Sequence, residues 1–410
     1  MPGANTWNFG KLTSILKMDF DFYLSEMSVS DLHGGGLTLQ RILGDDLMLI
    51  PYFAYVNRTA FDIPGIDKIR DREINLTSFW DSNIARKILG NTFARSTSRN
   101  SFILKKEAKR SAKLLAEKFQ DKPVLNAIVC PQGPASIYTL EALKRYRTIK
   151  YISWVMDDHI VKYNNDEWIY PEGMEQLMKK HLREAEHVFV ISPEMQNFYR
   201  NRFGIESTVL FGPFDSPDSN VPELLNDSDP LKIGYFGAVA AWQLDALQCV
   251  VKALSGTNVQ LHIYSTIEKL PADITSGNVH FEGRIGPNQV LIEMRKYNAI
   301  LLPISFTEAR RNMSEFNIAT KMSEYLASGI PILAVGPQYA AMVNYLKTNN
   351  AAIVVDNCKE EDIKNAFTLL NDQSKIAVIL NNAKKLELTE TGTLPMRERW
   401  LKGINKTSSE

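Results

Sequence analysis

Cysteine is scarce in this chain of 410 residues: there are only three, Cys130, Cys249 and Cys358, and no two of them form a CxxC pair. An odd and widely spaced set excludes a disulfide framework and a thiolate zinc site, and it is typical of a reducing compartment. Each cysteine stands beside apolar residues. We therefore expect all three to be small buried hydrophobes.

The sequence also lacks any excess of charge, since 47 basic side chains balance 47 acidic ones. This balance argues against a general nucleic-acid binder, although it leaves room for a local basic patch. No segment approaches the roughly 18 apolar residues that a membrane-spanning helix needs. The N-terminus lacks the charged start and apolar block of a secretory signal. We expect a cytoplasmic protein that has no nucleic-acid partner.

Short apolar runs alternate with helix-sized amphipathic stretches along most of the chain. The runs lie at 21–27, 47–56, 126–130, 150–156, 187–192 and 207–211, and then at 232–237, 259–265, 279–283, 298–304, 331–335 and 351–355. Continuous apolar runs of this length are typical of parallel strands that helices cover on both faces. The alternation predicts an α/β protein built from doubly wound, Rossmann-like sheets.

Twelve strands are too many for one compact sheet of this kind, so we expect two domains. Residues 213–230 are rich in Pro, Asp, Ser and Asn, which break helices and strands and favour a linker. We predict an N-terminal domain over 1–212, a C-terminal domain over 231–390, and a final helix and tail over 391–410 that packs back on the N-terminal domain. Two such domains place a cleft between the carboxyl ends of their sheets, where α/β sheets bind ligands.

One segment, 86–118, is strongly basic, with ten Lys or Arg and two Glu. It is interpreted either as a face for an anionic membrane surface or a phosphate-bearing acceptor, or as an amphipathic helix with solvated lysines. We favour the solvated helix because no aromatic cluster accompanies the charge. Peripheral contact with the inner membrane surface stays open as the alternative.

Three consecutive glycines, Gly34, Gly35 and Gly36, follow the first predicted strand. They permit close approach of the backbone to a ligand, and the helix N-terminus behind them favours an anion. Their spacing is not GxGxxG, which argues against a dinucleotide. A flexible turn is the simpler interpretation, but we favour contact with a phosphate or a sugar.

The sequence Asp157-Asp158-His159 follows the apolar run 150–156 and so emerges at the carboxyl end of a strand. Carboxylates beside an imidazole can orient sugar hydroxyls, bind a metal or transfer protons. The structural alternative is a turn or a helix cap. Because side chains alternate in direction along a strand, we expect the two carboxylates to point at different partners.

In the second domain, Gly237 ends the first predicted strand and brings backbone N–H groups toward a phosphate. Trp242 and Asp245, which follow it, we interpret as packing and capping residues.

The most specific segment is 314–336, which predicts a helix of about 12 residues that begins near Asn317 and ends at Gly329. Thr320 and Lys321 then lie in its first turn, where a diphosphate finds N–H donors and positive charge. Glu324 follows one turn later, and its carboxylate can accept two hydrogen bonds from vicinal ribose hydroxyls. The structural alternative is a surface helix with an i, i+3 Lys–Glu pair.

The stretch TKMSEYLASGIPIL (320–333) resembles the nucleotide-sugar signature of GT-B glycosyltransferases of the large retaining family four. HFEGRIG (280–286) and IGYFGAVAAW (233–242) resemble other parts of the same module. The resemblance covers most of the second domain. It implies transfer of a hexose from a nucleoside diphosphate sugar to a hydroxyl of a glycan or a lipid-linked glycan. It further implies retention at the anomeric carbon, no metal and no other cofactor.

The resemblance also implies roles for residues of the second domain. Glu324 corresponds to the acid that holds the donor ribose, and Thr320 and Lys321 fall where the diphosphate is bound. Arg284 and Ile285 occupy the loop that contacts the base.

In the first domain, the resemblance extends to layout. Gly35 and Gly36 correspond to the loop that closes on the donor phosphate, and Asp158 and His159 lie where a residue contacts the transferred sugar. An epimerase or hydrolase that uses the Asp157–His159 segment as acid and base is the alternative enzyme.

Two features depart from the family pattern. The Arg and Lys that commonly follow the first strand of the second domain are missing, since Ala238 and Val239 follow Gly237. The other departure is a missing glutamate. Phe316 stands where the family has its first glutamate, with Glu315 one place off and Glu308 further back. This departure keeps a non-catalytic nucleotide-sugar-binding subunit open as a further alternative.

Overall fold

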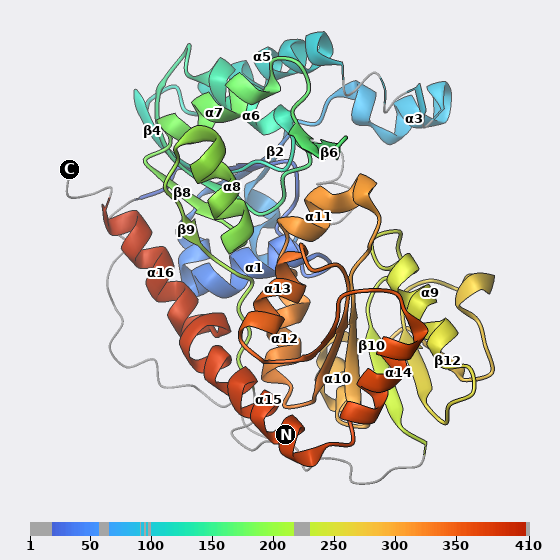
Figure 1. Cartoon of the computed structure of the whole chain (residues 1–410). Coiled ribbons are helices and arrows are strands. Elements are labelled where there is room, and N and C mark those ends of the chain that lie inside the picture. Colours follow the sequence, from blue (N-terminus) through green and yellow to red (C-terminus); the bar gives the residue numbers. More distant parts are fainter. Residues whose placement is uncertain are drawn as a thin grey trace.

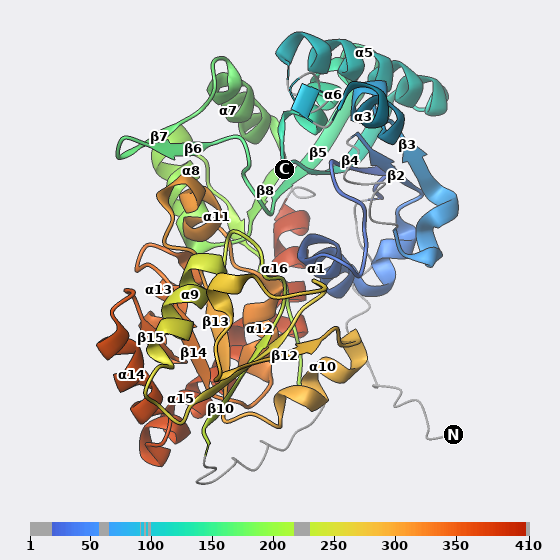
Figure 2. The ribbon, with the colours of Figure 1, turned by 90° about the vertical axis from the view of Figure 1, so that its right-hand side faces the viewer.

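The computed structural model describes residues 19–56, 65–90, 92–93, 96, 100–216 and 230–406. Two parallel sheets, each with helices on both faces, form two domains that face each other (Figures 1 and 2). The predicted fold class, two Rossmann-like domains, is confirmed.

The N-terminal sheet has seven strands in the order β3-β2-β1-β4-β5-β8-β9, and all its strand pairs are parallel. Its strands are β1 (Phe22–Ser25), β2 (Tyr52–Tyr55), β3 (Glu73–Asn75), β4 (Val124–Cys130), β5 (Thr148–Val155), β8 (His187–Val190) and β9 (Thr208–Val209). The α-helices are α1 (Gly34–Leu43), α3 (Asn83–Leu89), α5 (Ser101–Lys118), α6 (Pro134–Leu143), α7 (Met174–Glu184) and α8 (Pro193–Phe203).

The C-terminal sheet has six strands in the order β12-β11-β10-β13-β14-β15, again with parallel pairs throughout. Its strands are β10 (Lys232–Phe236), β11 (Gln260–Tyr264), β12 (Val279–Gly283), β13 (Ala299–Pro303), β14 (Ile332–Val335) and β15 (Ile353–Val355). The α-helices are α9 (Leu244–Ala253), α10 (Pro287–Met294), α11 (Arg311–Glu315), α12 (Thr320–Ala327), α13 (Ala341–Thr348), α14 (Glu360–Leu369), α15 (Gln373–Leu386) and α16 (Thr393–Lys406).

Each of the twelve predicted apolar runs contains a strand. Strands β13 and β14 are buried along their whole length and β4 along its second half, which is why they are apolar without alternation. Two features were missed. Strand β3 is three residues long and partly exposed, and the antiparallel hairpin of β6 (Lys162–Asn164) and β7 (Glu167–Ile169) has exposed residues at the ends of both strands. Neither presents an apolar run.

The last helix, α16, runs from the C-terminal domain back along the N-terminal one (Figure 1). Trp400 on this helix is fully buried and lies with its ring centroid 5.4 Å from Trp154 and 5.0 Å from Phe189. Arg397 forms an ion pair with Asp46 at 2.8 Å. The N-terminal domain thus completes its core with a helix from the other end of the chain.

The residues just after β9 also contact the C-terminal part of the chain. The backbone N–H of Phe214 donates to the carbonyl of Thr391 at 3.0 Å, and that of Ser216 donates to Glu387 at 2.8 Å. Most of the predicted linker, 217–229, lies outside the described residues, and so does 1–18. The predicted domain boundaries stay predictions.

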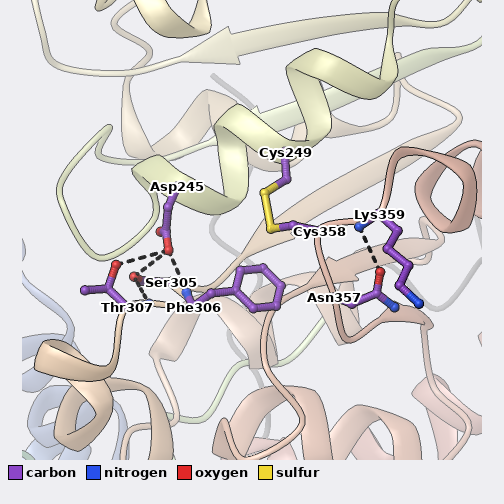
Figure 3. Close-up of a disulfide and its surroundings, with 8 residues drawn as sticks. All are labelled: Asp245, Cys249, Ser305, Phe306, Thr307, Asn357, Cys358 and Lys359. Atoms are coloured by element: carbon purple, nitrogen blue, oxygen red, sulfur yellow. Dashed lines mark hydrogen bonds between the residues drawn. A yellow bond between two sulfur atoms is a disulfide. The ribbon is translucent and has the colours of Figure 1, made fainter.

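The expectation of three buried, unpaired cysteines is wrong for two of them. Cys249 on α9 and Cys358 after β15 form a disulfide with Cα atoms 5.3 Å apart (Figure 3). Cys249 is half-buried and Cys358 is exposed, while Cys130 is free and buried as expected. The paired cysteines are 109 positions apart in the sequence, and the pairing was not predictable because only the fold brings α9 beside the β15–α14 loop.

Candidate active site

The glycine loop and the start of α12 meet at the boundary between the two domains. Thr320 Oγ1 donates a hydrogen bond to the carbonyl of Gly34 at 3.2 Å. A Cβ on Gly34 would lie 2.8 Å from this hydroxyl, and a Cβ on Gly36 would collide with the backbone of Ser30. Glycine is therefore required here for close packing of the loop on itself and on the second domain. Gly35 has more room: its Cβ would lie 3.3 Å from Met156.

His33 caps helix α1 and was not predicted as a site residue from the sequence. Its Nδ1 accepts a hydrogen bond from the backbone N–H of Gly36 at 3.1 Å, and its Nε2 is buried. No partner of Nε2 is found within the described part of the chain. Burial lowers the pKa of His33, so the neutral imidazole is favoured. The position of His33 directly before the three glycines was the feature of the sequence that could have indicated its role.

Helix α12 begins at Thr320, three residues after the expected start near Asn317, and it is 8 residues long. Thr320 and Lys321 therefore occupy its first turn. The Lys321 side chain is half-buried and its ammonium lies 5.2 Å from the ring centroid of Tyr235. A Cβ on Gly237 would collide with the Lys321 ammonium, so the two predicted residues are in contact. Burial lowers the pKa of Lys321 to about 8, and Glu324 offsets part of this decrease.

Glu324 faces the N-terminal domain and forms an ion pair that the sequence reasoning missed. Arg41 on α1 donates to Glu324 Oε1 at 2.8 Å, and both side chains are about three-quarters buried. Arg41 also donates to the carbonyl of Pro213 at 3.1 Å. Arg41 lies seven residues, or two helical turns, after Gly34, so the helical period places both on one face of α1. No local signal pairs Arg41 with Glu324.

The three residues Asp157, Asp158 and His159 follow β5 and point in different directions. Asp157 accepts a hydrogen bond from the side-chain amide of Asn317, across the domain boundary. Burial raises the pKa of Asp157, and the nearby His159 opposes the increase. The His159 side chain is exposed, and its backbone N–H donates to the carbonyl of Gln132 at 3.2 Å.

Asp158 is 4% exposed and is surrounded by hydrogen-bond donors of its own domain. Its Oδ1 accepts from the backbone N–H groups of Ile160 and Val161 at 2.9 and 3.1 Å. Its Oδ2 accepts from the hydroxyls of Tyr170 and Tyr199 at 3.0 and 2.9 Å. Four hydrogen bonds use the acceptor capacity of a carboxylate, so in this structure Asp158 fixes the loop.

A second buried carboxylate, Glu26, stands at the end of β1 and was also missed. It accepts from the backbone N–H groups of Gln132 and Ser136 at 2.9 and 2.8 Å, and from the Ser136 hydroxyl. Burial raises the pKa of Glu26 even though these hydrogen bonds oppose the increase. Glu26 thus ties the end of β1 to the start of α6, beside the glycine loop.

Phe316, at the position of the family's first glutamate, is buried between aromatic rings of the N-terminal domain. Its ring centroid lies 4.4 Å from Trp168 and 4.8 Å from Phe198, and its carbonyl accepts from Ser192 at 2.7 Å. The neighbouring Glu315 is held by Arg311 at 2.5 Å. These contacts pack the segment that precedes α12 against the other domain.

The loop after β13 is fixed by Asp245, on the first turn of α9 (Figure 3). Asp245 accepts from the hydroxyl of Ser305 at 3.0 Å, the backbone N–H of Phe306 at 2.7 Å and the hydroxyl of Thr307 at 3.3 Å. The interpretation of Trp242 as a packing residue is wrong, because its side chain is 48% exposed. Asp245 therefore caps a loop that leads to α11.

Arg284 and Ile285 lie on the loop between β12 and α10, where a base contact was predicted. Arg284 is exposed, and Ile285 is half-buried and packs against the core. Among the described residues, no group of three or more His, Cys, Asp or Glu side chains is arranged to hold a metal ion.

Comparison with solved structures supports the fold. The chain is similar to sucrose-phosphate synthase from Thermosynechococcus elongatus, with a TM-score of 0.66 and 12% identity over 95% of this chain and 99% of that one. It is similar to Anabaena HepE in complex with UDP-glucose, with a TM-score of 0.60 and 12% identity over 95% and 99%. Identities this low establish the GT-B fold alone.

TarM of S. aureus is also similar, with a TM-score of 0.53 and 17% identity over 72% of this chain. The chain spans 58% of the length of TarM. No family model matches the sequence, and no curated protein matches it either.

Proposed function

We propose that the chain is a glycosyltransferase that moves a hexose from a nucleoside diphosphate sugar to a hydroxyl of a glycan or a lipid-linked glycan. The observation that carries the proposal is the arrangement at the start of α12. Thr320 in the first turn contacts the glycine loop of the other domain, Lys321 beside it contacts Gly237, and Glu324 one turn later pairs with Arg41 on α1. The solved glycosyltransferases of the same fold support it, and HepE was solved with UDP-glucose.

In this proposal the donor diphosphate lies at the N-terminus of α12. The backbone N–H groups of the first turn and the ammonium of Lys321 are its donors, and the helix dipole adds partial positive charge. Charge develops on the diphosphate as the bond to the sugar breaks. Stabilisation of this leaving group lowers the barrier without a metal, and accounts for most of the catalysis.

Glu324 holds the ribose. Its Oε1 is engaged by Arg41, which orients the carboxylate, and we assign Oε2 to the vicinal ribose hydroxyls. We assign the buried Nε2 of His33 and the exposed imidazole of His159 to the transferred sugar. Asp158 acts as a positioning residue, because its hydrogen bonds hold the loop that carries His159. In the proposed reaction the transferred sugar keeps the configuration of its anomeric carbon.

The test measures transfer of labelled hexose from UDP-, GDP- and dTDP-sugars to a panel of glycan acceptors. Glu324→Ala should lower donor affinity and turnover at least about tenfold, the loss expected for a charged hydrogen bond. Glu361→Ala, which removes an exposed carboxylate on α14, is the matched control and should change neither. Unchanged kinetics in Glu324→Ala would refute the assignment of α12. Rapid hydrolysis or epimerisation of the donor without acceptor would favour the epimerase or hydrolase instead.

One observation favours a second candidate, a non-catalytic nucleotide-sugar-binding subunit. Phe316 replaces an acid with a ring that is buried between Trp168 and Phe198, so no carboxylate stands at this position to face the sugar. Tight binding of a donor without turnover on any acceptor would support this candidate and overturn the transferase.

A further inference from the structure

Large apolar side chains are exposed on one small region of the N-terminal domain. They lie on the short helix Phe79–Asp81, on α3 and just after it, and on the first turn of α5. The exposed residues are Phe79, Ile84, Ile88, Leu89, Phe93 and Phe102, and we call them the α3–α5 surface. Ile88 is 71% exposed and Phe102 is 75% exposed. Clusters of exposed apolar side chains mark interaction sites, whereas isolated ones need no explanation.

Helix α3 has apolar residues on its solvent-exposed side as well as on its buried side. Ala85 is fully buried and anchors the helix, while Ile84 and Ile88 lie one turn apart on the exposed side. A helix that only covers a core would carry polar residues at those two positions. Figure 1 shows α3 at the outer margin of the N-terminal domain, away from the C-terminal domain.

Helix α5 adds positive charge to this apolar surface. Its inner side is buried through Ala108, Ala112 and Leu115. Its sequence carries six basic residues and two acidic ones, and both acids are already paired within the helix, Glu107 with Arg110 at 2.8 Å and Glu117 with Lys113 at 3.8 Å. The charge left over is positive.

Three lysines supply exposed charge close to Phe102. Lys105 and Lys106 follow it within one turn of α5, and Lys109 comes one turn later. Lys87 adds an exposed cation on α3, between Ile84 and Ile88 in the sequence. Basic and apolar side chains are thus exposed next to each other on α3 and on the first turns of α5.

We propose that the α3–α5 surface docks on an anionic lipid bilayer. Apolar side chains that enter the acyl boundary, next to lysines that pair with anionic headgroups, are the two elements of peripheral membrane binding. No described helix is long and apolar enough to cross a membrane. The proposal does not rest on the transferase activity, because docking needs neither donor nor acceptor.

Sedimentation of the full chain with vesicles tests the proposal. Vesicles of phosphatidylcholine with phosphatidylserine should bind the protein at least about tenfold more strongly than phosphatidylcholine alone. The double variant Ile88→Asp, Phe102→Asp should lose binding to both. Lys105→Glu, Lys106→Glu should lose the preference for phosphatidylserine, again about tenfold or more. Leu388→Asp, at a side chain that is 66% exposed far along the chain, is the matched control and should bind like the unchanged protein.

Three results would overturn the proposal: no binding to either vesicle, binding that both aspartate substitutions leave intact, or binding that high salt abolishes completely. The last would show that headgroup charge acts alone and that the apolar side chains do not insert. Retention on heparin without vesicle binding would point to a polyanion instead. All substituted side chains are exposed, so unchanged melting temperatures are expected and confirm that the variants fold.

Discussion

The protonation of Lys321 sets the pH range in which the start of α12 attracts a diphosphate. Burial lowers its pKa to about 8. About nine-tenths of the protein then carries the ammonium at pH 7 and about one-tenth at pH 9. Because only the charged form attracts the diphosphate, the donor Kd should rise about tenfold between these two pH values. The direction of this pH dependence follows from the lowered pKa of Lys321 in the free protein. As the pH rises through that pKa, the ammonium loses its charge and the affinity for the donor falls.

Calorimetric titration with a nucleoside diphosphate sugar across this pH range is the assay. Lys321→Arg is the control, because a guanidinium stays charged and should flatten the profile. It also corrects for any titration of the donor itself. Glu324→Gln removes the charge that raises the Lys321 pKa and should move the midpoint of a weakened profile to lower pH. A profile that is equally steep in Lys321→Arg would refute the role of Lys321.

Three further predictions concern contacts that join distant parts of the chain. A double-mutant cycle of Arg41→Ala and Glu324→Ala should show a coupling of about 1 kcal/mol in the free energy of unfolding, because the pair is mostly shielded from water. Additive effects of the two substitutions would mean that the ion pair contributes nothing to stability. Cys249→Ser should lower the free energy of unfolding by about 2–4 kcal/mol under oxidising conditions, and a matching loss when the unchanged protein is reduced would confirm the disulfide as the cause. Trp400→Ala should cost about 3–5 kcal/mol, measured by denaturant unfolding, whereas a loss below about 1 kcal/mol would show that α16 does not complete the N-terminal core.

Much of the fold was predictable from the sequence because parallel strands that are buried on both faces have continuous apolar sequences. Strand β3 (Glu73–Asn75) was not predicted because it is short and contains polar residues. The end of α12 was predictable because Gly329, which adopts a positive φ of 74°, follows its last residues. Its start was not, since the helix begins at Thr320 and the expected start was near Asn317.

Contacts between the domains were not predictable in this way. Arg41 and Glu324 are 283 residues apart, and nothing local in the sequence records that they meet. The same holds for Asp158, because the two tyrosines that use up one of its oxygens come from a later loop and from α8. Residue type and spacing indicate which groups can carry chemistry, whereas the fold decides which of them are already occupied.

The structure of the protein with a bound nucleoside diphosphate sugar tests the central claim most directly. We predict the diphosphate at the first turn of α12, against Thr320 and Lys321, with the ribose hydroxyls on Glu324 and the sugar toward the glycine loop. A donor bound anywhere else, or a diphosphate that makes no contact with α12, would contradict the account.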